Sequence, residues 1–288
     1  MRRCIPHELV VIRGAGEMAS GAAYRLYRAG FRVILLEREC PTAIRRSVVF
    51  SEAVFEGSKV VEGVRAELCN SVPQALALAD EGACIPMLID PEARSVALLR
   101  PDVIVDGRML KRDPGPGPEG AEACLRVGLG PGHVAGTNCD LVVETERGHT
   151  LGRVIERGPA LPYSGRPGEI GGWRSERVVR APVSGTLRTH VEIGDDVTVG
   201  AVLVEVEGVA CRASIAGRVR GLLRDGSRVV AGQKIGDVDP RGALVDHTLI
   251  SDKARAVGGG VLEAVLGWMS GRIGLPRAGK AQQAGRET

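Results

Sequence analysis

The sequence predicts an α/β fold, in which a parallel-sheet domain precedes a small all-β domain and a short C-terminal helical segment. Three observations predict it. Residues 8–36 alternate an apolar run, a glycine turn, an amphipathic stretch and a second apolar run. Beyond a Pro/Gly-rich stretch at 158–173 the composition shifts to Val, Gly and short alternations, and one segment there occurs twice. The 288 residues suffice for two domains, each with its own core.

The composition is that of an ordinary globular protein and argues against several classes. Aromatic residues make up only 3% of the chain, and the net charge of +3 is not gathered into a basic block. We therefore expect neither a nucleic-acid nor a membrane partner. There is no signal-peptide core, and the seven cysteines contain no Cys-x-x-Cys pair. These features predict a cytoplasmic protein without a disulfide framework or a metal site.

The first elements follow from apolar spacing. Residues 9–12 are expected to form a strand, and 18–28 a helix that Gly30 ends. Residues 31–36 then form a second buried strand, which completes a strand–helix–strand unit. Later signals predict a helix over 71–80, strands at 85–89, 103–105 and 140–143, and a loop over 113–120.

The second half contains an internal repeat. Residues 181–206 align with 213–238 without a gap, at an offset of 213 − 181 = 32 residues. Turn glycines recur at this offset and fix the register of the short strands between them. We expect a quasi-twofold sandwich of small hairpins. The matching glycines are Gly185 with Gly217, Gly194 with Gly226, and Gly200 with Gly232.

This half resembles the biotinyl/lipoyl-like (barrel-sandwich hybrid) domain. Carrier domains of that kind bear a modified lysine on the hairpin between the repeats, but the connection here, residues 207–212, contains no lysine. The resemblance therefore implies a domain that docks on or covers something. The expected boundaries are 1–160 for the first domain, 161–176 for the linker, 177–241 for the repeat domain, 242–271 for the C-terminal helical segment and 272–288 for a flexible tail.

The C-terminal segment is expected to hold two helices. Ser251 or Asp252 is placed to cap a first short helix. Three glycines, 258–260, follow it and are expected to precede a second, amphipathic helix over 261–269.

The turn at residues 14–19 carries the main functional signal. The first glycine permits a tight turn, the second lets a pyrophosphate approach the backbone, and the third position packs helix on strand. The helix N-terminus presents free N–H groups to an anion. Glu37 follows at 37 − 14 = 23 residues, where an acid accepts from ribose hydroxyls. This predicts a Rossmann-like nucleotide-binding domain, and the turn residues are Gly14, Ala15, Gly16, Glu17, Met18 and Ala19.

Further candidates are less specific. Arg45 and Arg46 can clamp an anionic group or form a solvated charge pair. A second glycine run, with Gly130 and Gly132, can form an N–H nest. His133 in that run is a candidate pocket residue, with a hydrogen-bonded loop histidine as the alternative. Arg38 beside Glu37 can admit a 2′-phosphate. The ligand is therefore left open among NAD, NADP, FAD and S-adenosylmethionine, and a turn that binds nothing is the alternative.

Several stretches taken together resemble the YqeB-type family, an accessory protein of the selenium-dependent molybdenum hydroxylase system. The family usually has Gly-Gly-Gly-Asp-Leu-Ala at the first turn, so residues 14–19 depart from it conservatively. The stretches are VIRGAGEMASGAAYRLYRAGF, PTAIRRSVVFSEAVFEG, LRPDVIVDGRMLKRD, VGLGPGHVAGTNCDLVVET, RGHTLGRVIERG, LLRDGSRVVAGQKIGDVDPRG and SDKARAVGGGVLEAVL.

The resemblance implies a factor that matures or loads a molybdenum hydroxylase client. The first domain is also similar to the Rossmann domain of XdhC-type chaperones, which implies a nucleotide cofactor such as molybdopterin dinucleotide. No catalytic residue can be carried over. Two other hypotheses remain. One is an NAD(P)-dependent oxidoreductase that uses Gly14, Gly16 and Glu37 for its cofactor and Lys111 or His133 as acid/base. The other is a scaffold without a ligand.

Overall fold

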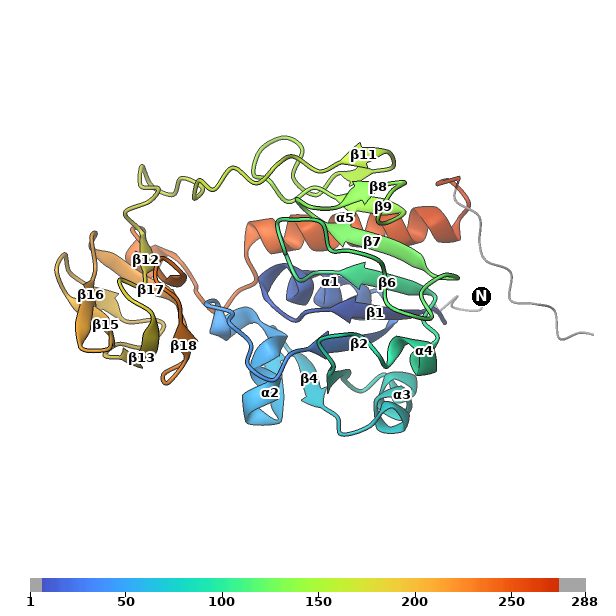
Figure 1. Cartoon of the computed structure of the whole chain (residues 1–288), viewed down its shortest axis with the longest axis horizontal. Coiled ribbons are helices and arrows are strands. Elements are labelled where there is room, and N and C mark those ends of the chain that lie inside the picture. Colours follow the sequence, from blue (N-terminus) through green and yellow to red (C-terminus); the bar gives the residue numbers. More distant parts are fainter. Residues whose placement is uncertain (1–6, 275–288) are drawn as a thin grey trace, which may run out of the picture.

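A nine-stranded sheet forms the larger part of the molecule, with the order β10-β9-β7-β6-β1-β2-β5-β4-β3 (Figure 1). The computed structural model describes residues 7–274. From β9 to β4 in this order the strands run parallel, and antiparallel β10 and β3 form the edges. The bounds are β1 (Leu9–Arg13), β2 (Arg32–Glu37), β3 (Ser58–Val61), β4 (Val64–Leu68), β5 (Ile85–Ile89), β6 (Val103–Asp106), β7 (Leu125–Leu129), β9 (Leu141–Val143) and β10 (Val154–Ile155).

Helices cover both faces of this sheet, so its central strands are apolar on both sides. Val10 and Ile12 of β1 share a core with α1 and α5, whereas Leu9 and Val11 share another with α3 and α4. The helices are α1 (Glu17–Arg28), α2 (Ala53–Glu56), α3 (Val72–Glu81), α4 (Val96–Leu99) and α5 (Asp252–Met269), with short 3-10 turns η1 (Arg46–Val48), η2 (Phe50–Glu52) and η3 (Gly242–Leu244). None of these described helices has the length and apolar character needed to cross a membrane.

Most of the elements expected in this half are present. The strand–helix–strand unit is β1–α1–β2, and β5, β6 and β9 occupy the predicted positions. Ser71 caps α3, because its hydroxyl accepts from the amide of Gln74 at 3.4 Å. Residues 113–120 contain no helix or strand. Two features were not predicted from the sequence: the hairpin β3–β4, and a two-stranded sheet of β8 (Val134–Ala135) and β11 (Gly158–Pro159).

The C-terminal expectation is wrong in one respect. The three glycines do not precede a helix but lie inside a single helix, α5, which packs along α1. A side chain at Gly258 would place its Cβ 2.5 Å from the carbonyl oxygen of Gly21, and one at Gly260 would lie 2.1 Å from that of Gly152. Close packing thus outweighs the low helix propensity of glycine. Of the tail predicted from residue 272, Ile273 packs into the main core, and residues 275–288 lie outside the described part.

Strands β12–β19 form the smaller part, which we call the repeat unit. Its two four-stranded sheets have the orders β12-β19-β17-β14 and β16-β15-β13-β18. The 32-residue shift carries each strand of one sheet onto a strand of the other, which confirms the predicted quasi-twofold arrangement. The strands are β12 (Val178–Arg180), β13 (Gly185–Thr189), β14 (Asp196–Val197), β15 (Val202–Val206), β16 (Val209–Arg212), β17 (Gly217–Leu222), β18 (Arg228–Val229) and β19 (Lys234–Asp239).

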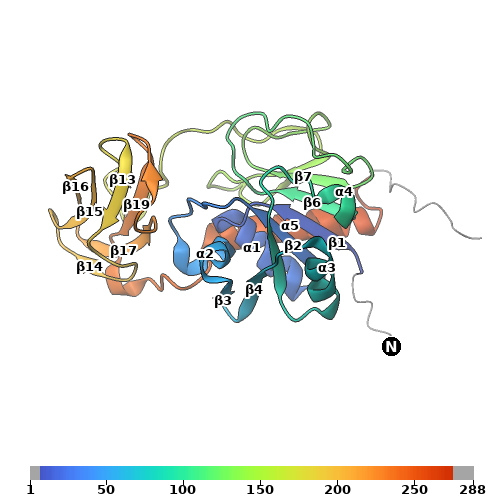
Figure 2. The same cartoon turned by 60° about the horizontal axis from the view of Figure 1, so that its bottom comes forward.

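The repeat unit has its own apolar core and meets the larger part beside α2, the helix nearest to it in both overall views (Figures 1 and 2). The amide of Leu222 donates to the carbonyl of Ile44 at 2.7 Å. Arg224 reaches across to Glu52 and Glu56 at 2.8 and 2.7 Å. These bonds fix the two parts against each other along residues 44–56.

Candidate functional site

A cavity of about 370 Å³ lies at the carboxyl ends of β1, β2 and β6. We call it the turn cavity. In open α/β sheets, ligands bind outside the carboxyl ends of the parallel strands. Six of the candidate residues line it: Gly14, Gly16, Glu17, Met18, Glu37 and Arg45.

The glycine turn is fastened to the end of β2. Gly14 adopts φ +90°, which favours glycine, and its amide donates to the carbonyl of Leu36 at 2.6 Å. The amide of Ala15 donates to the carboxylate of Glu37 at 2.7 Å. These two amides are therefore occupied within the protein.

Gly16 is different, because it faces open space. It precedes α1 with an extended backbone, and a Cβ built on it would meet no atom within 4 Å. Among residues 7–274, no protein acceptor pairs with the backbone amides of residues 16–19. The first turn of a helix leaves such donors free, and they carry the positive end of its dipole. The cavity therefore offers an anion a cluster of N–H groups with no side chain in front of Gly16.

Ala19 has a packing role. It is fully buried, and a Cβ at Gly107 would lie 2.8 Å from the Ala19 side chain. The small pair lets α1 approach the end of β6 closely. Ala19 therefore supports the shape of the turn without lining the cavity.

Glu37 faces the turn. One of its carboxylate oxygens accepts from Ala15, and the other accepts from the amide of Arg38 at 2.9 Å. Each carboxylate oxygen can accept more than one hydrogen bond. Glu37 thus holds the turn and keeps acceptor capacity at the rim of the cavity.

The two candidate arginines diverge. Arg45 lines the turn cavity with a side chain only 5% exposed, 3.6 Å from the carboxylate of Glu17. Burial lowers the pKa of Arg45, an effect that Glu17 opposes and the nearby Arg220 reinforces. Arg46 instead donates to the carbonyl of Leu222 at 2.8 Å and so joins the two parts of the molecule.

The second glycine run lies apart from the turn cavity. A Cβ at Gly130 would lie 2.3 Å from the hydroxyl of Thr145, and one at Gly132 would lie 2.1 Å from the carbonyl of Arg112. These glycines permit close packing of loops. His133 is 1% exposed, and its Nε2 lies 3.6 Å from the carboxylate of Asp106.

Asp106, at the end of β6, organises the wall beside the cavity. Arg108 binds it with two hydrogen bonds, of 2.9 and 2.6 Å, and itself lines the cavity. Burial alone would raise the pKa of Asp106, but Arg108 and His133 outweigh it and hold the pKa well below its usual value. Asp106 is therefore a charged anchor for Arg108.

We expect Asp106→Asn to destabilise the protein by about 2 kcal/mol at neutral pH, since it removes a charged partner from Arg108. Because the folded pKa is depressed, this contribution is complete above the unfolded pKa of about 4 and is lost as the pH falls toward the folded value. Urea unfolding at neutral pH and near pH 3 checks it. A gap between wild type and variant that is equally large at both pH values would contradict this role.

Arg13, which the sequence analysis did not single out, belongs to the same wall. It ends β1, is 8% exposed and donates to the carbonyl of Pro91 at 3.3 Å. Burial and the charge of Arg108 lower its pKa. Its position directly before the glycine turn was the available signal, because side chains at carboxyl strand ends face the ligand site.

A second hollow adjoins the turn cavity. It measures about 640 Å³, lies between the nine-stranded sheet and the repeat unit, and has more Arg and Lys than Asp and Glu in its lining. We call it the basic cleft. Glu17, Ile44, Arg45 and Met109 line both hollows. No group of three or more His, Cys, Asp or Glu side chains suited to a metal occurs within residues 7–274.

One curated protein is clearly similar to this chain. The uncharacterized protein YqeB of Escherichia coli (strain K12) is 49% identical over 260 residues, which cover 90% of this chain and 48% of YqeB. The chain thus spans about half the length of the relative that it matches. No protein-family profile matches it.

Solved structures give only remote likeness. The product-bound ectoine utilization protein EutE (DoeB) of Ruegeria pomeroyi is 13% identical, with a TM-score of 0.21 over 81% of this chain and 53% of its own. An aspartoacylase family protein of Mesorhizobium loti is 12% identical, with a TM-score of 0.23 over 81% and 84%. Scores this low carry no argument about activity.

Proposed function

We propose that this protein is an accessory factor that binds a nucleotide-containing cofactor at the glycine turn and handles it for a molybdenum hydroxylase. The observation that carries the proposal is Gly16, whose missing side chain leaves free helix amides open to a cavity. The hydroxylase client rests on the sequence resemblance to the YqeB-type family.

The strand order supports a Rossmann-like interpretation of the sheet. The chain proceeds from β1 to β2 and β5 on one side, then returns to β6 and β7 on the other side of β1. The glycine turn therefore follows the strand at which the strand order reverses, where dinucleotides bind in such sheets. The turn amides would hold the diphosphate, and Glu37 would accept from a ribose hydroxyl.

The ligand class follows from these groups. The cavity volume is in the range of small-molecule sites, and Leu36, Pro41 and Met109 add apolar wall beside the polar turn. Molybdopterin dinucleotide is the candidate that the family resemblance implies, and NAD(P) is the alternative. The resemblance to biotinyl/lipoyl-like domains supports a repeat unit that covers the ligand or docks on the client, since residues 207–212 offer no carrier lysine.

The oxidoreductase alternative has less support. Of its two acid/base candidates, His133 is buried behind Asp106, and Lys111 lines the basic cleft beside the ring of Tyr163. Neither lines the turn cavity. An acid/base group must come within hydrogen-bond reach of the reacting atom.

Ligand retention and binding test the proposal. Native mass spectrometry of the gently purified full chain should show a bound nucleotide, and calorimetry should detect ADP-ribose with a Kd on the order of micromolar. ADP-ribose presents a diphosphate between two riboses and so probes the turn without a reactive group. A protein that retains no nucleotide, and binds neither ADP-ribose nor NAD at millimolar concentration, would refute the proposal.

A further inference from the structure

Basic residues outnumber acidic residues in the lining of the basic cleft. Nine Arg or Lys residues and three Glu or Asp residues line it. Cations that line an enclosed hollow repel one another unless carboxylates or bound anions neutralise them. The local pairing therefore decides whether the cleft is a set of closed ion pairs or a site for a ligand.

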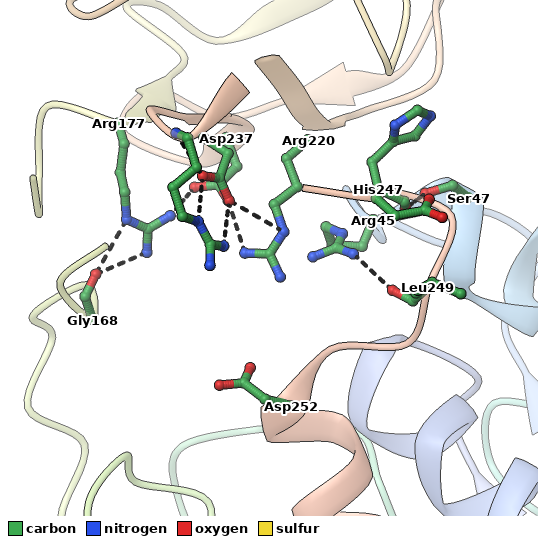
Figure 3. A network of polar contacts seen from close by, with 12 residues as sticks. Arg45, Ser47, Gly168, Arg177, Arg220, Asp237, His247, Leu249 and Asp252 are labelled. Carbon is green, nitrogen blue, oxygen red and sulfur yellow. Dashed lines mark hydrogen bonds and ion pairs between the residues drawn. The ribbon is translucent and has the colours of Figure 1, made fainter. Parts of the chain in front are cut away.

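Asp237 is shared among three cations. Its carboxylate, 5% exposed, is bonded by Arg177, lies 3.4 Å from the ammonium of Lys234 and lies 3.9 Å from Arg220 (Figure 3). Arg220 also lies 3.8 Å from Asp239, but Arg241 already binds that carboxylate at 2.8 and 2.9 Å. The carboxylates of Asp237 and Asp239 are thus shared among four cationic side chains, those of Arg177, Arg220, Lys234 and Arg241. Burial lowers the pKa of Lys234, and Asp237 only partly opposes this.

Arg45 adds a buried guanidinium from the opposite part of the molecule. Its side chain is 95% buried, since 5% is exposed, and its Nε has no hydrogen-bond partner within residues 7–274. Figure 3 shows the guanidinium groups of Arg45 and Arg220 close to each other, with Asp252 at the start of α5 below them. Two like charges thus lie together where water is partly excluded.

Lys253 completes the arrangement. It lies in the first turn of α5, where the helix dipole disfavours a cation, and within residues 7–274 its ammonium makes no hydrogen bond or ion pair. The neighbouring Asp252 pairs instead with Arg147, at 2.9 and 3.1 Å. Burial and Arg147 both lower the pKa of Lys253. Glu146, Glu17 and Glu144 oppose this shift only in part, so a bound anion would stabilise the charged ammonium further.

We propose that the basic cleft is a second anion site, which binds a compact, multiply charged oxyanion of the phosphate or pyrophosphate class between Arg45, Arg220 and Lys253. The cations come from three distant segments and converge on one hollow, as a tetrahedral oxyanion requires and an extended acidic peptide does not. The cleft meets the turn cavity at Arg45, so the oxyanion lies next to the nucleotide site. The anion site in the basic cleft does not depend on the proposed function. Only the statement that a nucleotide lies next to it rests on that proposal.

Inorganic pyrophosphate is the probe, titrated calorimetrically into the full chain at low ionic strength. We expect Lys253→Gln to weaken binding at least about tenfold, since it removes one charge-assisted contact. Arg220→Gln is expected to do the same. Arg188→Gln, which removes an exposed positive charge of the repeat unit outside the cleft, is the matched control and should leave the Kd within about twofold. The ammonium of Lys253 makes no hydrogen bond or ion pair within residues 7–274, so we expect its variant to fold.

The outcomes separate the two sites. If Lys253→Gln weakens pyrophosphate binding and Gly16→Asp leaves it unchanged, the result supports the anion site in the basic cleft. Binding that Gly16→Asp abolishes and Lys253→Gln leaves unchanged would place the probe at the glycine turn, which overturns the cleft site and keeps the nucleotide proposal. Equal effects of Lys253→Gln and Arg188→Gln, or no binding to the wild type, would also overturn it.

Discussion

Alanine at Gly258 or Gly260 is expected to lower the free energy of unfolding by about 2 kcal/mol, whereas alanine at Gly259 raises it by up to about 1 kcal/mol. The added methyl at Gly258 would lie 2.5 Å from the backbone oxygen of Gly21, and at Gly260 it would lie 2.1 Å from that of Gly152. Backbone atoms cannot swing aside as a flexible side chain does. At Gly259 a Cβ meets nothing within 4 Å, so only the gain in helix propensity remains.

Urea or thermal unfolding of the three variants measures this directly. The chemical change is identical at three consecutive positions of one helix, so helix propensity alone predicts the same effect three times. Three stabilising substitutions would show that α5 does not pack against α1 and residue 152 as closely as the structure has it. A destabilising Gly259→Ala would mean that this face of the helix is also covered.

The same helix shows where the sequence failed to predict the fold. Three glycines in a row are typical of a break between helices, because each lowers helix stability by about 1 kcal/mol. The apolar spacing nevertheless continues through them, from Ala254 and Val257 to Val261 and Val265, and all four side chains are buried. This continuous apolar spacing was the sequence signal for a single helix. The gain from close helix packing depends on α1, more than two hundred residues earlier, which no local pattern encodes.

Local signals did predict the first strand–helix–strand unit and the repeat. The turn at residues 14–19 combines required backbone conformation with apolar periodicity on both sides, so two independent constraints agree. The repeat was readable because its glycines recur at one fixed offset. The hairpin β3–β4 was missed since its strands are short and only partly buried, which leaves a weak alternation.

Some residues of the candidate site could be predicted from local sequence patterns, and others could not. Residues 14–18 and Glu37 are adjacent or one strand apart, so motif spacing brought them together. Arg220 and Lys253 line the same cleft as Arg45 only because the repeat unit docks beside α2 and the chain returns to form α5. Such proximity depends on the arrangement of distant segments. The run containing Gly130 and Gly132 looks like an anion nest in sequence, but the structure uses these glycines where loops pack closely.

The substitution with the largest expected effect on ligand binding is Gly16→Asp. The residue precedes α1 with φ −71° and ψ −172°, a conformation open to any amino acid, and a Cβ there meets no protein atom within 4 Å. Asp is a favoured N-cap residue, so the stability of the fold should change by less than about 1 kcal/mol. Its carboxylate would occupy the space before the free amides and repel a diphosphate. We expect the affinity for ADP-ribose to fall at least about thirtyfold, or about 2 kcal/mol.

Gly16→Asn separates charge from bulk, since Asn has the size and capping ability of Asp without the charge. If the helix amides bind a diphosphate, Asn should weaken ADP-ribose by an intermediate factor, and raising the salt concentration should narrow the gap between the two variants. Equal losses would mean that the side chain merely fills the space that a ligand needs, with no phosphate near the helix. Unchanged affinity in both variants, in a protein that still binds ADP-ribose, would place the nucleotide elsewhere. The glycine turn would then serve only to join β1 to α1, and the accessory role would lose its structural basis.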